Sequence, residues 1–115
     1  MSDERNSSES ERIDEALQII INKYCGEYQL LNDEMSINHE LPIDGDDASD
    51  FLNDIHARFE TKFKNFRFQK FFHEETSVLY YHWAKKLFGY KYKTVSFTYR
   101  HLKNVIRVGE WFDPP

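Results

Sequence analysis

Hydrophobic residues recur at helical spacing in several parts of the chain. Near the N-terminus, an apolar stripe repeats every three or four positions, as expected for one buried face of a helix. Ser8 and Glu11 have capping-box spacing, and Gly26 stands where a residue with positive φ ends a helix. We therefore predict a helix over residues 10–25, with five residues facing inward: Ile13, Leu17, Ile20, Ile21 and Tyr24.

A second amphipathic segment follows a long connection, residues 27–43, that has no clear period. Its apolar residues predict a helix over residues 46–60. Asp44 or Asp46 can cap this helix, and each carboxylate in its first turn stabilises the positive end of the helix dipole by about 0.3–1 kcal/mol. The inward positions of this helix are Ala48, Phe51, Leu52, Ile55 and Phe59.

The second half of the chain has a more mixed pattern. Residues 61–66 alternate as in an extended segment, and residues 67–73 repeat as in a short helix. Apolar residues four positions apart predict a further helix over residues 76–88, and residues 90–98 are typical of an extended segment. The pattern thus indicates a mainly α protein, with a short extended pair as one arrangement of the second half.

The C-terminal segment carries both a start and a stop signal for a last helix. Thr98 can cap it and Gly109 can end it. Its inward positions are Leu102, Val105 and Ile106, and Trp111 and Phe112 are expected to fold back onto the core.

Length and composition favour one small domain. The chain has 115 residues, 40% of them apolar and 17% aromatic, so a core of few, large side chains is expected. We predict a disordered tail over residues 1–9 and a single domain over residues 10–115. No apolar run approaches the roughly 20 residues of a membrane span, and no secretion signal is evident. Cys25 is the only cysteine, so an internal disulfide is excluded and a cytoplasmic protein is predicted.

Charge divides the chain into an acidic and a basic half. Residues 1–60 hold 16 acidic and 4 basic residues, a net charge of −12, whereas residues 61–115 hold 4 acidic and 11 basic residues, a net charge of +7. The two halves can neutralise each other in the folded protein. Alternatively, the protein is dipolar and presents an acidic side to a partner.

The acidic stretch "IDGDDASD" invites a calcium hypothesis, but its spacing fails. In an EF-hand loop that began at Asp44, the fifth, sixth and twelfth positions would be Ala48, Ser49 and Ile55, which lack the required ligands and glycine. The five histidines show no metal-binding spacing. We predict no metal site and interpret the acids as the start of a helix.

No pattern in the sequence predicts catalysis. A strand-to-helix nucleophile elbow and a glycine-rich phosphate loop are both absent, so we expect no catalytic residue and no enzymatic activity. An alternative hypothesis is nucleic-acid binding, because cations interleave with aromatic residues in the second half. The net acidity of the chain argues against it. The cations concerned are Lys64, Arg67, Lys70, Lys91, Lys93, Arg100, Lys103 and Arg107.

The order of these segments resembles that of an acyl carrier protein. Phe59 of "HARFE" matches the phenylalanine that ends the carrier's second helix, and Asp44-Gly45-Asp46 falls on the carrier's Asp-Ser-Leu. The similarity covers roughly residues 10–72 and 94–108, with residues 73–93 as an insertion. It implies a small acyl-carrier-like helical bundle with an inserted helix.

The chain also resembles a family of short bacterial proteins of unknown function within this carrier-like superfamily. The shared features are "GDDA" at Gly45 to Ala48, a phenylalanine-rich run at Phe66 to Phe72, and a closing "GEWFDP". This second match spans most of the chain. It implies a fold but no established activity.

One departure from the carrier pattern bears on function. A carrier attaches phosphopantetheine to a serine, whereas Gly45 at that position has no hydroxyl. We therefore expect no cofactor. In an alternative hypothesis, the protein is a carrier that is modified at Ser49 instead. The resemblance then implies a protein, a monomer or weak dimer, that acts through contacts with a basic protein partner. The acids expected to make those contacts are Asp44, Asp46, Asp47, Asp50 and Asp54.

Overall fold

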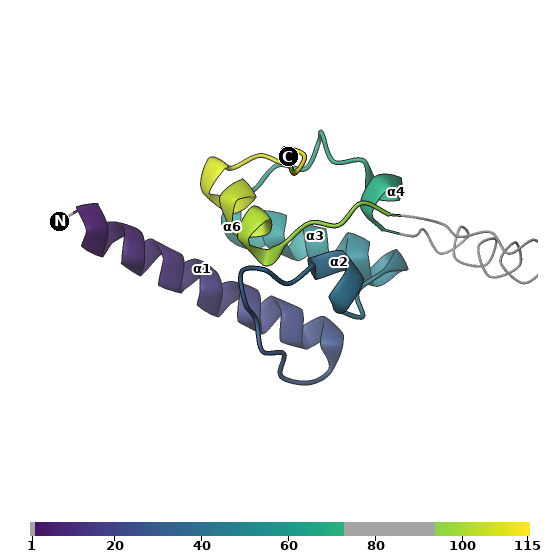
Figure 1. Cartoon of the computed structure of the whole chain (residues 1–115), viewed down its shortest axis with the longest axis horizontal. Helices are drawn as coiled ribbons and strands as arrows, with labels where there is room; N and C mark the ends of the chain where they lie inside the picture. Colours follow the sequence, from purple (N-terminus) through teal and green to yellow (C-terminus); the bar gives the residue numbers. More distant parts are fainter. Residues whose placement is uncertain (1, 73–93) are drawn as a thin grey trace, which may run out of the picture.

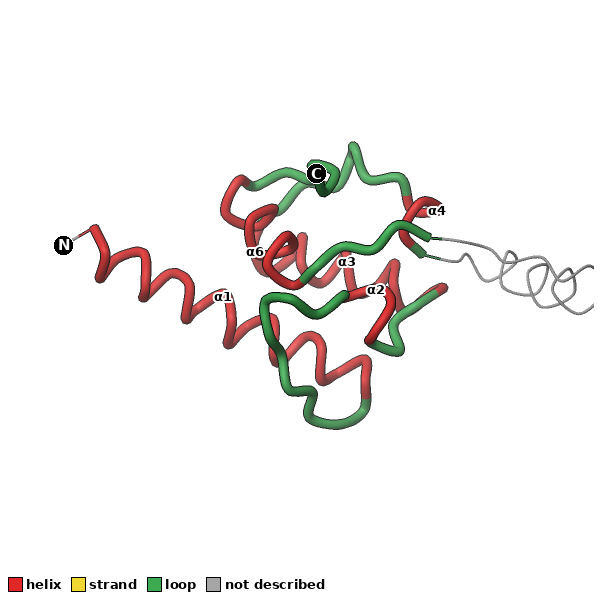
Figure 2. Tube along the Cα trace, in the orientation of Figure 1, coloured by secondary structure: helices red, strands yellow, loops and turns green. Residues whose placement is uncertain are grey.

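The computed structural model describes residues 2–72 and 94–115, and Figure 1 shows how its elements are arranged. Helices and irregular segments make up this part of the chain, without a strand in those two ranges (Figure 2). The mainly helical class is thus confirmed for the residues described. The elements in chain order are α1 (Ser2–Cys25), α2 (Ile37–Glu40), α3 (Gly45–Phe59), α4 (Phe68–Phe71) and α6 (Tyr99–Val108).

Helix α1 packs against α3 and ends where the sequence predicted. Gly26 has φ of 74°, and its N–H donates to the carbonyl of Asn22 at 3.0 Å. The predicted start near residue 10 was wrong, since the helix begins at Ser2 and includes residues predicted to form a disordered tail. No proline or glycine interrupts those residues, and acids near a helix N-terminus favour its dipole. In Figure 1 this end of α1 points away from the other helices.

Helix α2 lies inside the connection for which no helix was predicted. The Ser36 hydroxyl accepts a hydrogen bond from the N–H of His39, which caps the helix, and Ile37 is buried. The Asn38 amide donates to the carbonyls of Phe71 and Val95 at 2.8 and 2.6 Å. A helix of four residues is too short to show a hydrophobic period, so its existence depends on these tertiary contacts.

Aromatic side chains form the core beside α4. Phe66 stacks on Phe71 with ring centroids 5.1 Å apart and meets Trp111 edge-on at 4.7 Å. Trp111 is 2% exposed, which confirms that it folds back, whereas Phe112 remains 40% exposed. Helix α4 lies within the predicted range 67–73.

The two segments predicted as extended form no bridge with each other in the part of the chain that the structure describes. Instead, Lys62 forms an isolated bridge with Glu110, and Thr98 forms one with Ser36. The predicted helix over residues 76–88 lies outside the described residues.

Helix α6 follows its predicted signals closely. The Thr98 hydroxyl accepts from the N–H of His101 at 3.1 Å, and Gly109 ends the helix with φ of 92°. Leu102, Val105 and Ile106 are buried, as expected.

Candidate functional site

The start of α3 combines an acidic cap with an unusual backbone. The Asp44 carboxylate accepts a hydrogen bond from the N–H of Gly45 at 3.0 Å, and Gly45 has φ of 60°. This left-handed conformation favours glycine, because a Cβ there would crowd the backbone. The capping role of Asp44 is therefore confirmed, and Asp46 lies in the first turn.

Three aspartates form an exposed acidic row on α3: Asp46, Asp47 and Asp50. Spacings of three and four residues place Asp50 beside the other two on one side of the helix. Within the described part of the chain, none of the three side-chain carboxylates makes a hydrogen bond or an ion pair. Ser49 is also exposed, next to Asp50. The row is thus a concentration of negative charge that the fold leaves open to solvent.

Asp54 continues the acidic row by one turn but is engaged within the molecule. Its carboxylate accepts from the Tyr24 hydroxyl at 2.5 Å and from the Lys23 ammonium at 3.0 Å. The Tyr24 hydrogen bond lowers the pKa of Asp54, while burial and the same hydrogen bond raise the pKa of Tyr24. Of the five acids predicted to contact a partner, Asp54 is therefore the one that joins α3 to α1.

A groove runs between α1 and α3 beside this pair, with a volume of about 440 Å³. We call it the α1–α3 groove. Ile19, which contributes to it, is 72% exposed, an unusual position for a large apolar side chain. The residues that line it are Ala16, Ile19, Ile20 and Lys23 from α1, and Asp54, Ala57 and Arg58 from α3.

The exposure of Ile19 was not predicted, although the sequence contains a signal for it. Ile19, Ile20 and Ile21 are consecutive, and successive helical residues point about 100° apart. One buried stripe cannot include all three, so one isoleucine had to face elsewhere. Ile21 is fully buried, Ile20 is half-buried and Ile19 faces outward.

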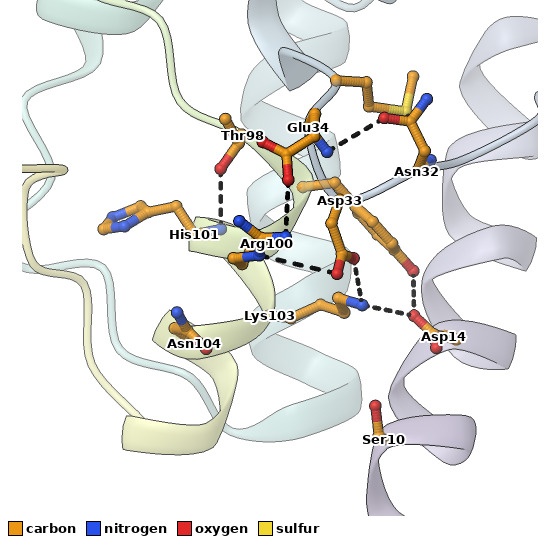
Figure 3. A network of polar contacts seen from close by, with 12 residues as sticks. Ser10, Asp14, Asn32, Asp33, Glu34, Thr98, Arg100, His101, Lys103 and Asn104 are labelled. Carbon is orange, nitrogen blue, oxygen red and sulfur yellow. Dashed lines mark hydrogen bonds and ion pairs between the residues drawn. The ribbon is translucent and has the colours of Figure 1, made fainter. Parts of the chain in front are cut away.

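A second group of charges, on α1, the segment after it and α6, is paired within the molecule (Figure 3). The buried Lys103 ammonium lies 3.2 Å from an Asp14 oxygen and 2.8 Å from an Asp33 oxygen. The Tyr99 hydroxyl also donates to Asp14, at 2.7 Å. Arg100 reaches Glu34 at 2.6 Å. These contacts connect α1, the segment after it and α6, and we call them the Lys103 network.

Several cations of the nucleic-acid hypothesis are paired with carboxylates inside the protein, which argues against that hypothesis. Lys103 and Arg100 are paired with carboxylates, and Lys70 lies 2.9 Å from Asp113. Phe71 and Phe72 are 1% exposed, so they offer no ring face for base stacking. The Lys91 and Lys93 of that hypothesis lie outside the described residues.

The described residues hold neither a cluster of metal ligands nor a thiol with a lowered pKa. Among residues 2–72 and 94–115, no group of three or more His, Cys, Asp and Glu side chains is placed to hold a metal ion. Cys25 is half-buried, and burial raises the pKa of its thiol, which disfavours the reactive thiolate. No helix in these ranges is long and apolar enough to cross a membrane.

Residues 10–113 match a protein family that is described as a protein of unknown function (DUF1493). The chain belongs to this family. The DUF1493 match includes α3 with its acidic row, the residues of the α1–α3 groove and the whole Lys103 network. No curated protein and no solved structure matches the chain. The likeness to acyl carrier proteins therefore depends on the sequence pattern.

Proposed function

We propose that this protein is an acyl-carrier-like protein without a prosthetic group, and that it binds a basic protein partner through the start of α3. The observation that carries the proposal is the acidic row, because Asp46, Asp47 and Asp50 are exposed and form no ion pair within the described residues. In contrast, Asp14, Asp33 and Asp54 all pair with lysines. Three free charges on one helix side attract a cationic surface.

The proposal assigns the protein a binding role and no catalytic one. Complementary charges at an interface raise the association rate and select the partner, more than they raise affinity. Binding a partner through these charges requires no prosthetic group, which is consistent with Gly45 at the position of the carrier's serine. Gly45 has φ of 60°, so the backbone as well as the missing hydroxyl departs from a serine site.

The test is binding to the native partner after charge reversal. Tagged protein would capture the partner from the cytosol of the source organism, and the purified pair would be titrated at several salt concentrations. Replacing Asp46 and Asp50 with lysine (D46K/D50K) should weaken the complex by about tenfold and flatten its salt dependence. The matched control is E11K/E15K, which reverses two exposed acids with the same spacing on α1. Equal affinity of D46K/D50K and the wild type would overturn the proposal.

A second candidate function is a carrier that is modified at Ser49, which its exposure on α3 allows. Intact mass spectrometry after expression with a phosphopantetheinyl transferase distinguishes the two. We expect no added mass for the wild-type chain. Gly45→Ser restores a hydroxyl at the carrier position and serves as a probe of whether the transferase recognises α3. A mass increase of the wild type that Ser49→Ala abolishes would favour the carrier and contradict our proposal.

A further inference from the structure

We infer that the α1–α3 groove receives an amphipathic helix of the partner, with its apolar face in the groove and its lysines or arginines over the acidic row. This inference rests on the proposed function, since it specifies how the basic partner is bound. It adds a surface, the groove, to which the sequence pattern gave no role.

Small side chains line part of the groove, so it has room for larger side chains from a partner. Ala16 and Ala57 are small residues on opposite helices, and both line the groove. Ile19 and Ile20 supply apolar area beside them, and Ile19 is 72% exposed. A partner helix that places apolar residues at three- and four-residue spacing would cover Ile19 and fill the space above the alanines. Covering an apolar surface of this kind lowers the free energy of the complex.

The charges around the groove are different at its two ends. Asp54 lines one end, and Asp50 and Asp46 follow at intervals of one turn toward the start of α3. Arg58 lines the groove one turn beyond Asp54 in the opposite direction. Lys23 also lines the groove and pairs with Asp54 at 3.0 Å, so the unpaired negative charge lies beyond Asp54, at Asp50 and Asp46. A helix in the groove therefore meets unpaired negative charge at one end only. The basic residues of the partner must lie at one end of its apolar stripe.

This polarity decides among possible occupants. Nucleic acids and anionic lipid surfaces carry the same sign of charge as the acidic row, which would repel them. A second copy bound through the same surface would add an equal set of acids to the interface instead of a basic face. A basic amphipathic helix satisfies both the apolar and the charged part of the surface.

The inference can be tested with a synthetic helix before the native partner is known. The probe is a labelled peptide of about sixteen residues, roughly four turns, with leucines at helical spacing and lysines grouped at one end. One control peptide has glutamates in place of the lysines, and another has the same composition in scrambled order. Fluorescence anisotropy with the full-length protein gives each dissociation constant. We expect the lysine peptide to bind more tightly than both controls.

Protein variants then locate the bound peptide. Ile19→Glu places a charge in the groove, and Ala57→Trp fills it; both sites are exposed, so the fold should tolerate the changes. Each should weaken binding of the lysine peptide by at least about tenfold. The matched control is Val108→Glu, at an exposed apolar position on α6 that is 67% accessible and outside the groove. D46K/D50K should also weaken binding.

Several outcomes would overturn the inference. These are no binding of the lysine peptide, equal binding of the glutamate peptide, or binding unaffected by Ile19→Glu and Ala57→Trp. Sedimentation that shows a wild-type dimer dissociated by Ile19→Glu would instead place a second copy in the groove. With the native partner, an effect of D46K/D50K without any effect of the groove variants would retain the proposed function and reject only the helix in the groove.

Discussion

The two acidic regions of this protein have similar residues and opposite surroundings. In the Lys103 network, Asp14 and Asp33 share a lysine that is only 7% exposed, and Glu34 binds Arg100. In the acidic row of α3, three aspartates stand next to one another without a cation within the described residues. The first region connects three parts of the fold. The second connects no other part of the described fold through ion pairs.

This contrast bears on the two interpretations of the divided charge. Basic residues of α6 neutralise acids of the first half of the chain, so mutual neutralisation holds around Lys103 and Arg100. Among the described residues, it does not extend to Asp46, Asp47 and Asp50. Position in space therefore decides the role of an acid. Buried or paired acids report on the fold, and exposed, grouped acids are the better candidates for a partner.

The largest expected effect comes from removing the cation of the Lys103 network. Lys103→Met keeps a long apolar stem but leaves Asp14 and Asp33 without their shared ammonium. Because the lysine is buried and both carboxylates are half-exposed, we expect the free energy of unfolding to fall by about 2–3 kcal/mol. Urea denaturation measures this change.

Arg100→Met is the control for that prediction. Arg100 also pairs with acids, Asp33 at 3.7 Å and Glu34 at 2.6 Å, but its side chain is 56% exposed. An exposed pair contributes at most about 1 kcal/mol, so the loss should be clearly smaller. Equal destabilisation by the two substitutions would show that burial of Lys103 has no special weight.

A smaller effect is expected from pH, through Asp33. The hydrogen bond from Lys103 is the main cause of the lowered pKa of Asp33 in the folded protein. A carboxyl group with a lowered folded pKa stabilises the fold above its unfolded pKa, near about 3.9, and that stability is lost as the pH falls through the folded pKa. Asp33→Asn should therefore be less stable than the wild type at pH 7 by about 1 kcal/mol.

The difference between Asp33→Asn and the wild type should shrink as the pH falls below about 4, because the wild-type carboxyl then becomes protonated. Urea denaturation across this range measures the difference directly. Comparing the two proteins cancels the contributions of Asp54 and Asp113, whose pKa values are also lowered. A difference that is constant with pH would show that the ionised form of Asp33 is not what stabilises the fold.

The elements that could be predicted from the sequence are those with local signals. Helices α3 and α6 have a hydrophobic period and a capping residue, and Gly109 also marks the end of α6. Their bounds agree with the predicted ranges to within one residue or so. Helix α2 has no period, since it spans only Ile37–Glu40, and the bonds of Asn38 to distant carbonyls hold it in place. Tertiary contacts of this kind are not visible in a local window.

The candidate site also has features that the sequence predicts and features that depend on tertiary packing. The exposure of Asp46, Asp47 and Asp50 follows from the helical period of α3, because they alternate with the buried Ala48 and Phe51. The engagement of Asp54 depends on the register between α1 and α3, which brings Lys23 and Tyr24 to it. That register is set by packing between segments about 30 residues apart, so the sequence alone did not separate Asp54 from the other acids.

The smallest expected effect is a change in the free energy of unfolding when an aspartate is replaced by asparagine. Its sign should differ between the acidic row and the Lys103 network. Asp50 lies three or four residues from Asp46, Asp47 and Asp54, and like charges at these spacings destabilise a helix by about 0.2–0.5 kcal/mol per pair. Asp50→Asn should therefore raise the free energy of unfolding by about 0.5 kcal/mol at low ionic strength, and by less in high salt. Asp33→Asn changes the same type of side chain and should lower it. If Asp50→Asn were destabilising, the acidic row would serve the fold as the Lys103 network does, and its exposure would no longer indicate a partner.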